Sequence, residues 1–220
     1  MAHARQLSGE VLNELTKGIG GLVARHDMSV SSQGPPVLAE SFEIFLLTPR
    51  DIRSAVERGS GLTKIIRRTG QWHHQIGVGG EARGFARSVE PKRAQDSWSV
   101  SGVFVSELAS KIEAAIQRID AERPDDSAEV RLVDFPGYHM HFFLIESPTE
   151  VKAKPQRKES SKRSKSFAQR EVFVIASPFS IPGLKEAQFY SEQQFLQSLL
   201  EVPFIRGVIH KRHRRKARKN

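Results

Sequence analysis

The sequence predicts an α+β fold: a single domain in which about four to five helices pack on a mostly antiparallel sheet. Apolar residues recur at helical spacing in some segments and alternate with polar residues in others. Hydrophobic residues make up 38% of the 220 residues and include 13 Phe, enough to fill a core. The distribution of charge, taken up below, sets two basic segments apart from this domain.

The first helix is predicted over 9–25, with Ser8 as its N-cap. Its apolar residues fall on one helical stripe. Residues 29–36 have the composition of a loop, and the apolar run 42–47 then predicts a short buried strand. The stripe consists of Val11, Leu12, Leu15, Ile19, Leu22 and Val23.

A second helix is predicted to begin after Thr48, because Pro49 suits the first helical position and Asp51 the third. It extends to Arg58, where the Gly59-Ser60-Gly61 segment ends it. A further short helix up to Gly70 is predicted from Leu62, Ile65 and Ile66.

Residues 71–78 alternate in character and predict a strand, with Trp72, His74, Ile76 and Val78 on one face. Gly79-Gly80 suits a two-residue turn, after which residues 82–89 can return antiparallel. A charged loop over 90–95 follows this hairpin.

The second half of the chain predicts one long helix, three strands and a last helix. Ser106 can cap a helix that ends before Pro124. The runs 130–135 and 138–146, joined at Pro136-Gly137, are apolar enough to be central strands and to form the core of the domain. Residues 171–176 predict another strand and residues 191–201 a helix.

Charge divides the chain into an acidic body and two basic segments. The net charge is +9, yet residues 152–170 hold eight Lys and Arg against one acid, and residues 206–220 hold eight against none. The remaining residues hold 18 Lys and Arg against 24 Asp and Glu. We therefore expect one domain over 1–146 with 171–205, a basic disordered insert over 147–170 and a basic tail over 206–220.

Several classes of protein are excluded by composition. No run approaches the about 18 apolar residues of a membrane span, and the N-terminus lacks the layout of a secretory signal, so we expect a cytoplasmic protein without a membrane partner. The absence of Cys excludes thiolate metal sites and cysteine nucleophiles. No GxSxG, HExxH, GxxxxGK[ST] or GxGxxG motif occurs in its required context, so no cofactor is expected.

The C-terminal cluster of Lys and Arg indicates contact with nucleic-acid phosphates, without strong sequence preference. The insert would reinforce this contact, and two short helices would add an ordered basic surface. An acidic protein partner and a solvated tail remain alternatives. The candidate residues are Lys211, Arg212, Arg214, Arg215, Lys216, Arg218 and Lys219 in the tail, Lys162, Arg163 and Lys165 in the insert, and Lys64, Arg67 and Arg68 in the domain.

Two histidines form the second candidate site. His139 and His141 are two residues apart on a predicted strand, so their side chains would share a face and could bind a metal or a phosphate, with His73, Asp134 or Glu146 as a third group. The alternative is that these histidines are structural and simply hydrogen-bonded. His74, on the face of Trp72, is expected to be a hydrogen-bonded core residue.

Three functions follow from these patterns. The first is a non-catalytic intracellular binding protein whose basic segments contact RNA or DNA phosphates. The second is a histidine- or metal-dependent hydrolase of a phosphate-containing substrate, with His139, His141 and His73 in the catalytic role. The third is a structural subunit of a larger protein complex.

Overall fold

The computed structural model describes residues 6–25, 37–93, 95–122, 128–147, 169–177 and 180–202. Within these ranges the chain forms the predicted α+β domain, with eight strands in one mostly antiparallel sheet and four α-helices. The predicted tail lies outside the described residues, and so does most of the predicted insert. Ser147, Gln169 and Arg170, which were assigned to the insert, instead belong to two paired strands. No helix in the described part of the chain is long and apolar enough to span a membrane.

The sheet has the strand order β4-β3-β2-β1-β5-β6-β7-β8. All neighbours are antiparallel except β1 and β5, which pair in parallel over Ile44–Leu46 and Leu132–Asp134. The helices are α1 (Gly9–Arg25), α2 (Pro49–Arg58), α3 (Glu107–Glu122) and α4 (Glu192–Leu200), and the strands are β1 (Val37–Leu46), β2 (Arg67–Val78), β3 (Glu81–Val89), β4 (Ser99–Phe104), β5 (Glu129–Phe135), β6 (Met140–Ser147), β7 (Gln169–Ala176) and β8 (Gln188–Ser191).

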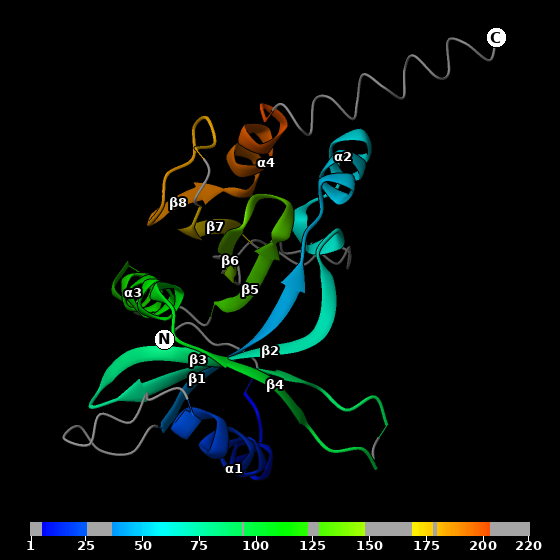
Figure 1. The fold of residues 1–220 in the computed structure, drawn as a ribbon. Coiled ribbons are helices and arrows are strands. Elements are labelled where there is room, and N and C mark those ends of the chain that lie inside the picture. Colours follow the sequence, from blue (N-terminus) through cyan, green and yellow to red (C-terminus); the bar gives the residue numbers. More distant parts are fainter. Residues whose placement is uncertain are drawn as a thin grey trace, which may run out of the picture.

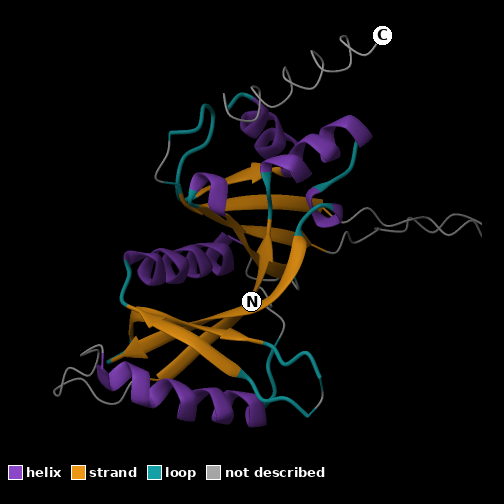
Figure 2. Ribbon diagram, turned by 45° about the vertical axis from the view of Figure 1, so that its right-hand side comes forward, coloured by secondary structure: helices purple, strands orange, loops and turns teal. Residues whose placement is uncertain are grey.

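The helices cover both faces of a strongly bent sheet (Figures 1 and 2). Helix α3 lies inside the bend, between the half formed by β1 to β4 and the half formed by β5 to β8. Helices α1, α2 and α4 lie on the opposite, outer face. Alternation along β6 shows the two layers, because Phe143 packs in the core with α3 whereas Phe142 packs in the core with α2 and α4. We call these the α3 face and the outer face.

The predicted central strands are confirmed. Strands β5 and β6 lie in the middle of the sheet, and β6 is buried on both faces, since Phe142, Phe143, Leu144 and Ile145 are all fully buried. This double coverage explains why the segment is a nearly continuous apolar run rather than an alternating one.

Helix α2 is confirmed with the predicted boundaries. The side chain of Thr48 accepts a hydrogen bond from the Asp51 backbone N–H, and Asp51 accepts one from the Thr48 backbone N–H. Gly59 ends the helix in the left-handed conformation at φ 59°. Ser191 begins α4 with the same kind of cap, here with Gln194.

The predicted short helix up to Gly70 is wrong. Only Leu62–Lys64 forms a single 3₁₀ turn, and β2 already begins at Arg67. Leu62 and Ile66 are buried as a helical pattern would suggest, but Arg67, Arg68 and Gln71 pair with β1 instead. Pairing along a neighbouring strand satisfies more backbone groups than one extra helical turn would.

Two strands were not predicted, and both lie at the edges of the sheet. Strand β4 has the sequence SVSGVF, and β8 spans only four residues. Edge strands pair on one side and are often short. They therefore carry little of the apolar pattern on which strand prediction depends.

An irregularity in β2 accompanies the bend of the sheet. Ile44 pairs with Gln71 while the next residue, Phe45, pairs with Arg68, so Thr69 and Gly70 are extra residues in β2. Gly70 has φ 70°, and the Thr69 hydroxyl donates to the Ile44 carbonyl at 2.6 Å. The strand curves strongly between its two ends (Figure 1).

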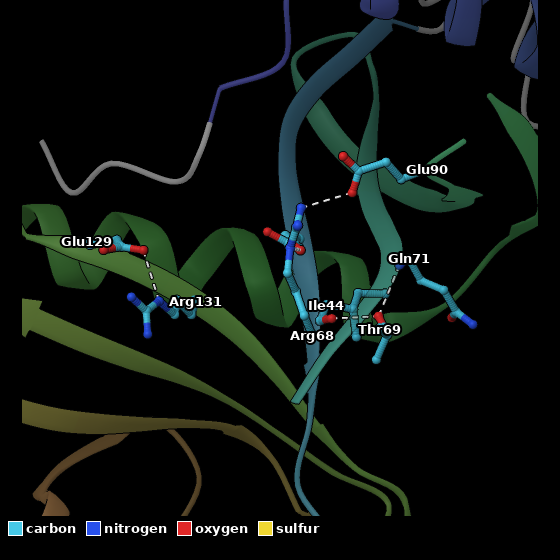
Figure 3. A network of polar contacts seen from close by, with 8 residues as sticks. Ile44, Arg68, Thr69, Gln71, Glu90, Glu129 and Arg131 are labelled. Carbon is cyan, nitrogen blue, oxygen red and sulfur yellow. Dashed lines mark hydrogen bonds and ion pairs between the residues drawn. The ribbon is translucent and has the colours of Figure 1, made fainter. Parts of the chain in front are cut away.

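Alternating charges cross the outer face between the apolar core under α1 and the one under α2 and α4. Figure 3 shows part of this row, with Arg68 beside Glu90 and with Arg131. We call this row the charge ladder. It combines a buried acid, Glu43, with arginines from three strands, and Arg131 also lies over the Phe45 ring. Arg68 lies 2.9 Å from Glu90, and Glu146 lies 3.0 Å from Arg131 and 2.8 Å from Arg170. In order across the face, the ladder consists of Glu90, Arg68, Glu43, Arg131, Glu146, Arg170 and Glu192.

Replacement of Gly70 by Ala is expected to lower the free energy of unfolding by about 1–2 kcal/mol, because the positive φ strains a residue with a Cβ atom. No atom lies within 4 Å of the position of the added Cβ, so the cost comes from the backbone alone. Urea unfolding of Gly70→Ala measures it. Gly20→Ala is the matched control, since Gly20 is an exposed helical residue with equal space, and there we expect a gain of up to about 1 kcal/mol. A Gly70→Ala protein as stable as the wild type would contradict this account of the bend.

Candidate functional site

The predicted basic residues of the tail and of the insert lie outside the described residues, so their arrangement is not part of the structure. Lys64, Arg67 and Arg68 are described and exposed. Arg67 pairs with Asp51 at 3.1 Å, and Arg68 pairs with Glu43 and Glu90. Two of these three predicted phosphate-binding cations therefore already have carboxylate partners, and they lie on a strand rather than on a helix.

His139 and His141 do not share a strand. Pro136–Tyr138 forms a 3₁₀ turn, and His139 follows it in the left-handed conformation with φ 48°. Strand β6 begins only at Met140, so the expected two-residue alternation applies to His141 and not to the exposed His139. The turn at Pro136-Gly137 takes up two more residues than the sequence pattern suggested, Tyr138 and His139.

His141 instead belongs to a polar cluster on the α3 face. Its Nδ1 atom lies 2.8 Å from Oδ1 of Asp134, and Oδ2 of Asp134 accepts a hydrogen bond from Arg87 Nη2 at 3.0 Å. Strand pairing explains the proximity: Asp134 is opposite His141, and Arg87 is opposite His73. We call Arg87, Asp134, His141 and His73 the histidine cluster.

Burial and charge determine how Asp134 titrates. Burial alone would raise its pKa, but the hydrogen bond and charge of His141 and the ion pair with Arg87 outweigh burial, so the pKa lies below its usual value. Asp134 is therefore a carboxylate at neutral pH. Because His141 directs Nδ1 at this carboxylate, the neutral imidazole carries its proton on Nδ1 and keeps a lone pair on Nε2.

His73 is fully buried, and neither of its ring nitrogens has a hydrogen-bond partner among the described residues. Its ring stacks on Phe85 with centroids 4.4 Å apart, and Phe85 stacks on the exposed Phe104 at 5.1 Å. The pKa of His73 is lowered to about 3. Burial is the main cause, and the positive charge of Arg87 has a larger effect than the opposing negative charge of Asp134. His73 is thus neutral at physiological pH.

The prediction for His74 is confirmed. Its two ring nitrogens contact the hydroxyls of Ser41 and Ser88 at 2.9 and 2.7 Å, and burial lowers its pKa to about 4. His74 is on the outer face of β2, opposite to His73, and so takes no part in the histidine cluster.

The three histidines of the alternative catalytic prediction are therefore not equivalent. His141 has an aspartate and an arginine beside it, His73 lies in the same cluster, and His139 lies outside the strand. No group of three His, Cys, Asp or Glu residues in the described ranges is arranged to hold a metal ion. The cluster suits proton transfer or anion binding better than it suits metal chemistry.

Arg87 was not predicted to lie beside Asp134, the partner of His141. The two residues are far apart in the sequence, and they meet only because β1 lies between the hairpin of β2 and β3 and the central strand β5. The alternation of residues 82–89 places Arg87 on the same face as Phe85, but no local pattern shows which strand lies beside β1.

No known protein family matches the chain, and comparison with curated proteins and with solved structures also finds no match. Function is therefore inferred from the chemistry of the residues and not from the fold.

Acid is expected to destabilise the domain through His73 and His74. Both pKa values are lower in the folded state than the usual 6.5, so the unfolded chain binds protons more readily and stability falls as pH drops below about 6.5, by about 1.4 kcal/mol per pH unit for each group. At pH 5 each histidine should lower the free energy of unfolding by about 2 kcal/mol. Urea unfolding at pH 7.5 and pH 5 measures the loss.

The matched pair of variants is His73→Leu and Phe85→Leu. Between pH 7.5 and pH 5, the free energy of unfolding of His73→Leu should fall by about 2 kcal/mol less than that of the wild type. Phe85→Leu perturbs the same ring stack without removing a titrating group, so it should keep the wild-type pH dependence. Equal pH dependence in all three proteins would show that His73 does not titrate as described.

Proposed function

We propose that the protein is a non-catalytic binding protein that contacts the phosphates of RNA or DNA through its basic segments over 152–168 and 206–220. The observation that carries the proposal is the segregation of charge. The described residues hold 17 Lys and Arg against 20 Asp and Glu, while the other residues hold 17 against five. The excess of positive charge thus lies almost entirely outside the described part of the chain.

The ion pairs of the domain support this division of roles. The arginines of the sheet and of α3 bind carboxylates of the same chain, which reduces their capacity to attract phosphate. Seven arginines form such pairs: Arg67, Arg68, Arg83, Arg87, Arg118, Arg131 and Arg170.

Contact of this kind is electrostatic, and its affinity depends only weakly on the base sequence of the nucleic acid. Each phosphate neutralised by Lys or Arg releases counterions, so the logarithm of the binding constant falls linearly with the logarithm of salt concentration, with a slope of about −0.9 per phosphate on B-DNA. Eight Lys and Arg in 206–220 should contribute a large part of that slope.

Deletion of 206–220 should weaken binding to a generic RNA and to a generic DNA and should make the salt dependence less steep. Fluorescence anisotropy over a salt series measures both effects for the full chain and for a chain that ends at Ile205. The control is a full chain with Lys64→Gln and Arg67→Gln. It removes two cations of the domain, and because these are not proposed to contact phosphate, the slope should stay close to that of the wild type, whereas two lost phosphate contacts would reduce it by about 1.8 units. Equal affinity of the full and shortened chains would refute the proposal. In that case an acidic protein partner, or a place in a larger complex, would become the better explanation of the basic segments.

One observation favours a second candidate function, acid–base catalysis on a phosphate-containing substrate. Asp134 holds the His141 ring by its Nδ1 atom, which leaves Nε2 to accept a proton from an attacking water or hydroxyl. Arg87 places a positive charge beside the same carboxylate. In such an arrangement the aspartate orients the imidazole that takes the proton, and a guanidinium can stabilise negative charge on a phosphate.

Hydrolysis of bis(p-nitrophenyl) phosphate tests the second candidate. If His141 is the base, His141→Gln should reduce turnover by at least about 100-fold. His139→Gln, which removes an exposed histidine two residues away, should leave turnover unchanged. A wild-type protein with no turnover above the buffer rate, or a His141→Gln protein with full turnover, would exclude this role.

A further inference from the structure

A pocket of about 310 Å³ opens between β1, the turn that joins β2 to β3, and α3. We call it the hairpin pocket. It lies away from the histidine cluster, and none of the residues of that cluster lines it. Its walls combine apolar side chains, among them Val37, Ala39 and Ile116, with four carboxylates: Glu40, Glu81, Glu113 and Asp120.

Local structure explains how these acids meet. The pairing of β1 with β2 is irregular between Leu38 and Ser41, and this irregularity turns Ala39 and Glu40 toward the pocket. On α3, Glu113 and Asp120 are seven residues apart, which is close to two helical turns, so they lie on one side of the helix. Glu113 also accepts a hydrogen bond from the Ala82 backbone N–H at 3.3 Å, at the start of β3.

A buried amide lines the same pocket. Gln75 is only 3% exposed, and its Nε2 atom donates to the Ala109 carbonyl at 3.0 Å. Its Oε1 atom has no hydrogen-bond partner among the described residues. A buried acceptor without a donor is costly, by about 1–3 kcal/mol. Gln75 therefore adds to the carboxylates an acceptor that a ligand with N–H groups can satisfy.

The acids are close enough to repel one another. Burial raises the pKa of Glu40, and the charges of Asp120 and Glu113 raise it further. A cation placed between these carboxyls would relieve the repulsion. The described residues contain no group of three acids or histidines arranged around a metal ion. The apolar side chains of Val37, Ala39 and Ile116 in the same walls suit a cation that carries an alkyl chain.

We propose that the hairpin pocket binds an aliphatic ammonium group, from a free polyamine or from a lysine side chain. The carboxylates balance the positive charge, Gln75 Oε1 accepts an N–H bond, and the methylene groups of the ligand pack on Val37, Ala39 and Ile116. The volume is near the lower limit for small-molecule pockets, which suits a short alkyl amine. This site is independent of the proposed phosphate contact, because its own charge is negative.

Titration of the full chain with spermidine, followed by ¹H–¹⁵N NMR, tests the proposal. The resonances that move should be those of the first half of β1, the β2–β3 turn and α3. Tetramethylammonium chloride at the same ionic strength is the control ligand, because it carries charge but no N–H donor, and it should not move them to a comparable extent.

Three variants, each lacking one negative charge, separate a specific site from general attraction. Glu40→Gln and Asp120→Asn should each weaken spermidine binding about three- to tenfold. Glu122→Gln is the matched control, since Glu122 is on the same helix but does not line the pocket, and it should change affinity less than about twofold. Equal weakening by all three variants, or shifts no larger than those with tetramethylammonium, would overturn the proposal.

A second probe distinguishes the two sources of the ammonium group. Nα-acetyl-lysine N-methylamide presents a lysine side chain without a free α-amine. If it binds the full chain as tightly as an alkyl monoamine of equal length, the pocket accepts a lysine of a protein. If only spermidine binds, the pocket is a site for free polyamines.

Discussion

Three residue pairs between the parallel strands β1 and β5 join the two antiparallel halves of the sheet, and the other features of the structure depend on this junction. Because β1 also pairs with β2, the junction brings Arg87 and His73 to the same face as Asp134 and His141. The irregularity at Gly70 lies opposite the residues of β1 that pair with β5, where the sheet bends. Helix α3 occupies the inside of this bend. A sheet of two separate halves would have neither the histidine cluster nor a continuous core under α3.

The charges of the domain follow from the same geometry. Among the described residues no helix lies over the middle of the outer face, and the charge ladder covers that region with alternating Arg and Glu side chains. Each exposed pair contributes little stability, about 0–1 kcal/mol, but together the pairs neutralise most of the arginines of the sheet. This internal neutralisation supports the proposal that the segments over 152–168 and 206–220, and not the domain, contact phosphates.

The fold could be predicted where local chemistry decides the outcome. A few neighbouring residues are enough to determine such an element. The cap formed by Thr48 and Asp51 begins α2, Gly59 ends it, and the apolar run of β6 defines a buried strand. Prediction was wrong at residues 65–70, where pairing with β1 overrides a helical pattern, and it missed the short edge strands β4 and β8. Of the candidate site, His141 and Asp134 could be named from the sequence, but Arg87 and the acids of the hairpin pocket could not, because strand order brings them together.

Contact of the polyanion with the basic segments, and not with the ordered domain, can be mapped residue by residue. Titration of the full chain with a generic single-stranded RNA, followed by ¹H–¹⁵N NMR, reports on backbone amides along the whole chain. We expect shifts for residues 152–168 and 206–220, with the resonances of Lys64, Arg67, Arg68 and the histidine cluster unchanged. Shifts concentrated on β2, β3 and β6 with none in the basic segments would contradict this expectation and would place the contact on the sheet.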